Sequence, residues 1–235
     1  MTTDTPQALI EDLVAANRIL AMEGVLDAYG HVSARSPVDP ARFLMSRSLA
    51  PQLVTAADIQ LYGADSEPLA DARKPYLERF IHGELYRQRP DVMAIVHSHS
   101  ASVIPFGISR TALRPVYHMA SFLWSGVPVF DIRATREEND LLIRDRPLGE
   151  ALAASLGKCA CVLMRGHGMT VVGENLREAV FRAVYTELNA RLQLQASSLA
   201  GPLQFLSDAE GRNATASNRP TIERPWELWK KKAMG

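Results

Sequence analysis

The sequence has no excess of either charge, few cysteines and no long apolar run. Its 235 residues hold 26 basic and 26 acidic side chains. Because there is no basic surplus to neutralise phosphates, we do not expect a nucleic-acid-binding protein. Apolar runs fall short of the roughly 20 residues that span a bilayer, so we expect no membrane insertion. With 47% hydrophobic and 22% charged residues, the composition is that of a globular protein.

Only two cysteines are present, Cys159 and Cys161, and they stand too close together for an unstrained disulfide. A reducing, cytoplasmic location is therefore the expectation. The pair could in principle bind a metal. Its place at the start of an apolar strand favours buried structural cysteines instead.

The order of apolar segments predicts one α/β domain over residues 1–235, without repeats or a convincing linker. Apolar spacing predicts helices and short strands in alternation. The elements that bear on function are helices at Tyr76–Arg89 and Glu174–Ala200 and strands at His31–Arg35, Val92–Val96, Cys161–Arg165 and Met169–Val172. A polar loop is expected at about 207–221, followed by a C-terminal tail that contains Trp226 and Trp229.

His97 and His99 form a His-x-His motif at the end of the strongly apolar strand 92–96. Side chains alternate along a strand, so the two imidazoles point to the same face. Two imidazoles this close can share a metal ion. Two polar residues on a solvated strand end would produce the same pattern, and the motif alone leaves both readings open.

His167 stands between Gly166 and Gly168, at a tight turn that joins two apolar strands. The glycines let the backbone turn sharply and leave room beside the ring. An ordinary hairpin turn would explain this motif by itself. Together with His97 and His99 it supplies a third nitrogen ligand, and three protein ligands with an open position are typical of a catalytic metal site.

Glu78 precedes His82 by four residues on the helix predicted after Pro75, so the two side chains share a helix face. A glutamate on an amphipathic helix is usually a solvated charge. It would matter here only if the fold brings it to the histidines. The turn at Gly30-His31-Val32-Ser33 is either ordinary hairpin chemistry or a place that offers an imidazole and a hydroxyl to an anion.

Taken together, these motifs resemble the class II aldolase/adducin family. The resemblance rests on Glu78-x3-His82, on Arg89-Pro90-Asp91-Val92 followed by His97-x-His99, and on Gly166-His167-Gly168, in that order and spacing. It extends from about residue 8 to about residue 200.

The resemblance implies a three-layer α/β/α sandwich around a largely antiparallel central sheet. It implies homotetramers with active sites near subunit interfaces. It also implies that His97, His99 and His167 bind one divalent metal ion per subunit, with Glu78 as the nearby carboxylate that acts in proton transfer.

The substrate side departs from the sugar-phosphate aldolases of this family. Where those proteins carry a Gly-Asn, a Thr-Gly and a Ser-Ser pair that hold phosphate, this chain has Gly30-His31, Ser46-Arg47 and Tyr76-Leu77. An arginine and aromatic neighbours suit a planar carboxylate on a ring better than a phosphate. His118 stands where the aldolases place a catalytic tyrosine. The predicted substrate-binding residues are His31, Ser33, Ser46, Arg47, Tyr76 and Tyr117.

This pattern resembles the family's aromatic-acid decarboxylases, which implies a metal-dependent carboxy-lyase of aromatic compound catabolism acting on a dihydroxyphthalate or hydroxypyridine-dicarboxylate. Glu78 or His118 would deliver the proton, and His118 is favoured because its ordinary pKa is nearer neutrality. A retro-aldolase or epimerase acting on a sugar or sugar acid is the alternative, and a non-catalytic adducin-like interaction domain is the third. Zinc, manganese, iron and cobalt all remain open as the metal.

Overall fold

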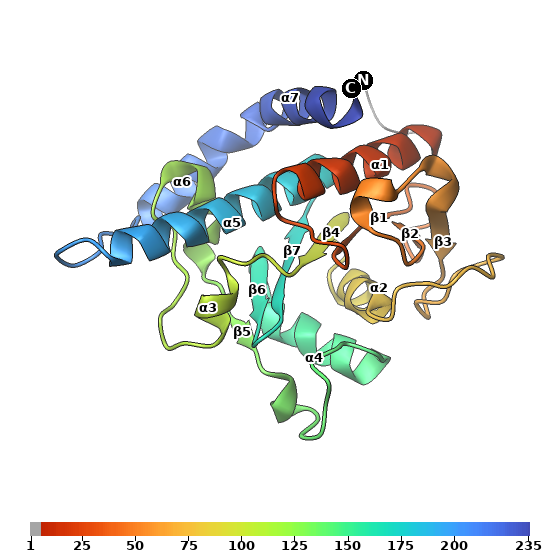
Figure 1. The fold of residues 1–235 in the computed structure, drawn as a ribbon, viewed down its shortest axis with the longest axis horizontal. Helices are drawn as coiled ribbons and strands as arrows, with labels where there is room; N and C mark the ends of the chain where they lie inside the picture. The colour runs from red at the N-terminus through yellow and green to blue at the C-terminus, as the bar shows by residue number, and fades with distance from the viewer. Residues whose placement is uncertain (1–5) are drawn as a thin grey trace.

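The computed structural model describes residues 6–235 and places seven strands in one sheet (Figure 1). The helices are α1 (Pro6–Met22), α2 (Arg79–Gln88), α3 (Ile104–Gly107), α4 (Arg146–Leu156), α5 (Leu176–Ser197), α6 (Asp208–Asn218) and α7 (Glu223–Met234). The strands are β1 (His31–Arg35), β2 (Phe43–Ser46), β3 (Ile59–Tyr62), β4 (Ala94–Ser98), β5 (Val129–Phe130), β6 (Cys161–Met164) and β7 (Gly168–Gly173).

The strands run in the order β3-β2-β1-β4-β7-β6-β5, and every neighbouring pair is antiparallel except β5 with β6. The predicted, largely antiparallel sheet is therefore confirmed. The register places His31 opposite His97 and His97 opposite Thr170 across the three central strands. The histidine-bearing ends of β1 and β4 thus lie next to each other in the middle of the sheet.

Helices cover both faces of the sheet, as a three-layer sandwich requires (Figure 1). Val96 and Val171 pack on the face covered by α1 and α5, and Ile95 and Val172 pack on the face covered by α2 and α4. Because both faces are covered, Ala94–Val96 of β4 and Val171 and Val172 of β7 are apolar on both sides of the sheet. No helix in the described range 6–235 is long and apolar enough to cross a membrane.

The polar loop predicted at about 207–221 is wrong, because this segment forms α6 and a 3-10 helix at Arg219–Thr221. Ser207 and Glu210 form a capping box that starts α6. Gly211 then packs on Trp124, so closely that a Cβ at this position would lie 2.2 Å from the Trp124 Cβ. Tertiary packing and a good N-cap therefore make a helix of a polar segment that contains Asn, Ser, Ala and one Gly.

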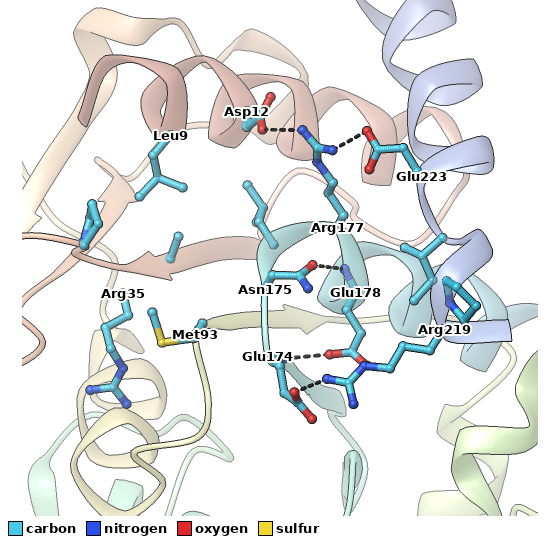
Figure 2. Close-up of a pocket in the computed structure, with 15 residues that line it drawn as sticks. Leu9, Asp12, Arg35, Met93, Glu174, Asn175, Arg177, Glu178, Arg219 and Glu223 are labelled. Atoms are coloured by element: carbon cyan, nitrogen blue, oxygen red, sulfur yellow. Dashed lines mark hydrogen bonds and ion pairs between the residues drawn. The ribbon is translucent and has the colours of Figure 1, made fainter. Parts of the chain in front are cut away.

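Ion pairs hold the C-terminal helices against α1 and α5, around a cavity of about 460 Å³ (Figure 2). Arg177 lies between Asp12 of α1 and Glu223 of α7, and Arg219 pairs with Glu174. These charged side chains neutralise one another, so the cavity belongs to the docking of the C-terminal helices rather than to the histidine motifs.

Candidate metal centre and its cavity

The structure brings Glu78, His97, His99 and His167 together at one end of the sheet. One ligand atom from each of these residues lies within 4.8 Å of the others. The side chains of Glu78, His97 and His167 are less than a tenth exposed, and that of His99 is 24% exposed. Residues from the end of β4, the β6–β7 turn and the start of α2 thus form one largely buried cluster.

Close pairing of β4 with β7 positions the histidines. His97 lies within β4 and His99 just beyond it, while His167 follows β6 in the tight turn to β7. A Cβ at Gly168 would lie 2.0 Å from the Ser98 carbonyl oxygen, so only glycine lets the two strands approach this closely. That approach sets the His167 Nε2 3.1 Å from the His99 Nε2.

Glu78 reaches the cluster because α2 begins at Arg79, three residues later than predicted. Glu78 is the N-cap residue and has non-helical backbone angles. The segment before Glu78 is held at Leu49 instead of continuing the helix, because the Tyr76 hydroxyl donates to the Leu49 carbonyl. His82 pairs with His31 and Ser33 rather than with Glu78, the residue that precedes it by four positions.

The Glu78 carboxylate uses both oxygens. Oε1 accepts a hydrogen bond from the Ile143 backbone N–H at 2.9 Å, and Oε2 lies 3.5 Å from the Nε2 atoms of both His97 and His167. Burial alone would raise the pKa of this carboxyl, but the two imidazoles outweigh burial and lower it well below its ordinary value. Glu78 is therefore a carboxylate aimed at the histidines.

Each histidine is oriented by a contact at its other ring nitrogen. His99 Nδ1 lies 3.0 Å from Asp27 Oδ2, His167 Nδ1 lies 2.8 Å from the Leu141 carbonyl oxygen, and His97 Nδ1 lies 3.3 Å from Thr170 Oγ1. Leu141 has a φ of +69°, a conformation that favours glycine, so the backbone is strained where it meets His167. These contacts direct all three Nε2 atoms to the centre of the cluster.

This donor set fits a divalent cation. The Nε2 of His97 is buried and has no hydrogen-bond partner among the described residues. Burial lowers the pKa of His97, which favours the neutral imidazole that binds metal. Three imidazole nitrogens and a carboxylate face one another here, and imidazole and carboxylate ligands of this kind hold zinc and related metals.

A cavity of about 330 Å³ opens beside the cluster. Of the residues predicted to act in the site, His31, Tyr76, Glu78 and His99 line it. Its remaining lining residues are Ala28, Tyr29, Ser48, Leu49, Ala50, Leu77 and Leu142. The rings of His31 and Tyr76 contact each other with centroids 4.6 Å apart and form an aromatic part of the wall.

Four other predicted substrate residues do not line this cavity. Ser33 lies behind His31 and contacts His82 and Tyr86. Ser46 is buried at the end of β2, and Arg47 forms an ion pair through Nε with Asp58 at 2.7 Å. Tyr117 is half-buried beside a second cavity at the end of α5.

His118 also lies away from the cavity within this chain. It is exposed at the start of a 3-10 helix, His118–Ser125, that packs on α6, and its carbonyl accepts a hydrogen bond from Asn218. In Figure 1, α6 lies at the left of the molecule, whereas α2, which begins beside Glu78, lies right of centre, below β1 and β2.

Sequence reasoning missed Asp27, Leu141 and Thr170, the residues that orient the histidines. The sequence could have indicated a turn at Asp27, since aspartate is typical of such turns. In the structure its Oδ1 accepts hydrogen bonds from the N–H groups of Tyr29 and Gly30. The Leu141 contact is made by its backbone carbonyl, which every residue type has, so the sequence does not reveal it.

Comparison with known proteins agrees with this geometry. Residues 11–194 match the family described as Class II Aldolase and Adducin N-terminal domain. The chain belongs to this family. Decarboxylase tropJ of Talaromyces stipitatus is 38% identical over 94% of this chain and 92% of its own length. A 3,4-dihydroxyphthalate decarboxylase of a Terrabacter species is 34% identical over 79% of this chain and 80% of its own length.

Among solved structures, the L-fuculose 1-phosphate aldolase of Glaciozyma antarctica superposes with a TM-score of 0.81 at 22% identity. The superposition covers 99% of this chain and 92% of that one. At this level of identity the likeness shows a shared fold. It confirms the class II aldolase-like sandwich that the sequence motifs imply.

The Asp27 contact predicts a loss of metal affinity in Asp27→Asn. The substitution keeps an oxygen for the turn but removes the negative charge beside His99 Nδ1. Loss of such an outer contact typically weakens metal binding by about 10–100-fold. Competition with a chromogenic chelator measures the change. Asp65→Asn is the matched control, because Asp65 accepts a backbone hydrogen bond in a turn away from the cluster. Equal affinity in the two variants would contradict the role of Asp27.

Proposed function

We propose that this protein is a divalent-metal-dependent decarboxylase of a hydroxylated aromatic carboxylate, such as a dihydroxyphthalate or a hydroxypyridine-dicarboxylate. The observation that carries the proposal is the buried cluster of three histidines and a glutamate that opens into a cavity with an aromatic wall. The two decarboxylase relatives, each aligned over most of its length, support a carbon–carbon lyase that releases carbon dioxide.

The cavity wall favours a flat aromatic acid over a sugar phosphate. The Tyr76 hydroxyl is engaged by the Leu49 carbonyl, so Tyr76 contributes its ring rather than a free hydroxyl to the cavity. His31 contributes a second ring beside it. For a second carboxylate we propose Arg47, which forms an ion pair with Asp58 through Nε and directly precedes the cavity residue Ser48.

In this reaction the bond between a ring carbon and a carboxylate carbon breaks, carbon dioxide leaves, and the ring carbon keeps the electron pair and takes up a proton. A divalent cation held by His97, His99 and His167 supplies Lewis acidity toward an oxygen of the substrate. Three imidazoles suit zinc, and manganese, iron and cobalt accept the same donors. We expect one metal ion per chain.

We infer that the proton donor is a group other than Glu78, because the neighbouring imidazoles hold the pKa of Glu78 well below its ordinary value and its oxygens are directed at Ile143 and the histidines. His118 is our proposed donor. Since His118 lies outside the cavity of its own chain, we propose that a second copy in a homotetramer brings it to the ring carbon.

The substrate class is tested by an ultraviolet assay of the metal-loaded protein. We expect hydroxylated phthalates or pyridinedicarboxylates to lose carbon dioxide, and we expect no condensation of dihydroxyacetone phosphate with aldehydes. Glu78→Gln removes the carboxylate charge that faces His97 and His167 and should lower the rate by about 10–100-fold. Glu67→Gln removes a half-exposed carboxylate outside the cavity and should leave the rate unchanged. Turnover of the phosphate with none of the aromatic acids would refute the proposal.

The origin of the proton donor is tested by mixing two defective proteins. Glu78→Gln and His118→Ala should each be much less active alone than the wild-type protein. If each site combines Glu78 of one chain with His118 of another, subunit exchange between them restores part of the wild-type activity. Size-exclusion chromatography with differently tagged chains verifies the exchange. Full activity of His118→Ala, or no recovery in verified mixed oligomers, would rule out His118.

A further inference from the structure

A chain of hydrogen bonds runs through the core from the cavity residue His31 to Tyr86. His31 Nδ1 lies 2.7 Å from His82 Nε2, His82 Nδ1 lies 2.6 Å from Ser33 Oγ, and Ser33 Oγ lies 2.7 Å from the Tyr86 hydroxyl. All four side chains are buried. The four groups therefore have to satisfy one another's donors and acceptors.

Two ordinary periodicities assemble this chain. His31 and Ser33 are two residues apart on β1 and so point to the same face of the sheet. His82 and Tyr86 are four residues apart on α2 and so share the helix face that packs on β1. Phe43 packs against the rings of His82 and Tyr86, which closes the layer.

The direction of the hydrogen bonds follows from the Tyr86 end. Burial raises the pKa of the Tyr86 phenol, so the phenol keeps its proton. Ser33 Oγ is its hydrogen-bond partner in the described structure, so the phenol donates to that oxygen. The Ser33 hydroxyl then donates its own proton to His82 Nδ1. His82, a neutral ring with an accepting Nδ1, carries its proton on Nε2 and donates it to His31 Nδ1.

The opposite direction leaves a buried donor unsatisfied. If His31 donated to His82, each later proton would point toward Tyr86, and the phenol proton would have no acceptor. A buried donor without an acceptor is destabilising, because it loses its hydrogen bonds to water and forms none in the protein. The arrangement that begins at Tyr86 pairs every proton in the core and leaves the one on His31 Nε2 for the cavity.

We propose that Tyr86, Ser33 and His82 hold His31 in the Nε2–H form, so that His31 donates a hydrogen bond into the cavity to an anionic oxygen of the substrate. His31 lines the cavity, and its Nδ1 is already used, so Nε2 is the ring nitrogen available to a ligand. Ser33, His82 and Tyr86 are then positioning residues. The role toward the aromatic acid rests on the function proposed above, whereas the ring state of His31 does not.

The ring state is measured by nitrogen NMR of the isotopically labelled, zinc-loaded protein without substrate. Long-range proton–nitrogen correlation distinguishes protonated from unprotonated ring nitrogens, and His31→Gln and His82→Gln assign the two rings. We expect protonated Nε2 and unprotonated Nδ1 on both. A protonated Nδ1 on either ring overturns the proposal, whatever the enzyme does with aromatic acids.

Removal of the Tyr86 hydroxyl, the donor at the end of the series of hydrogen bonds, tests the role of His31 in substrate binding. Tyr86→Phe should give His31 a mixture of ring states and raise KM for the aromatic acid about tenfold, with kcat changed less than about twofold. Tyr62→Phe is the matched control. The buried Tyr62 hydroxyl donates to Gln60, and neither residue belongs to the series of hydrogen bonds from Tyr86 to His31. Where Tyr86→Phe does not fold, Ser33→Ala replaces it, and Ser33→Thr, which keeps the hydroxyl, should restore the wild-type values. An unchanged KM in a variant with mixed ring states would overturn the role of His31 toward the substrate.

Discussion

Three imidazole nitrogens and a carboxylate oxygen face one another at this site, and a positive charge between them stabilises such an arrangement. Much of the local backbone serves to produce it. β4 and β7 approach to a distance that only Gly168 allows, Leu141 takes a strained conformation that offers its carbonyl to His167, and α2 begins late enough to free Glu78. The packed sandwich beneath holds these elements in place.

Around the cluster, the same face of the sheet carries two further layers. His31 and Tyr76 form the aromatic wall of the cavity, and Ser33, His82 and Tyr86 lie behind His31 in the core. The solved aldolase shares the sandwich, so the fold does not decide the reaction. In our proposal the lining of the cavity decides it. The equal numbers of acidic and basic residues gave no reason to expect a polyanionic partner, but they say nothing about a local site that a metal would make cationic.

The sequence predicted the parts of the site that depend on local pattern. His97-x-His99 after an apolar strand and His167 between two glycines identified the histidines, because strand alternation and a glycine turn have short-range signatures. Long-range constraints were not visible. Tyr76 is held by Leu49, which delays α2 to Arg79, and Gly211 packs on Trp124, which makes α6 from a segment that looks like a loop. The sequence placed His82 only on the helix face of Glu78, because its partners on β1 are 51 and 49 residues away.

The most direct test of the account is to locate the metal by anomalous diffraction from crystals of the metal-loaded protein. The account predicts one strong anomalous peak per chain, bounded by the Nε2 atoms of His97, His99 and His167 and adjacent to Glu78. Metal-saturated crystals with no peak at this cluster, or with the strongest peak elsewhere, would contradict it.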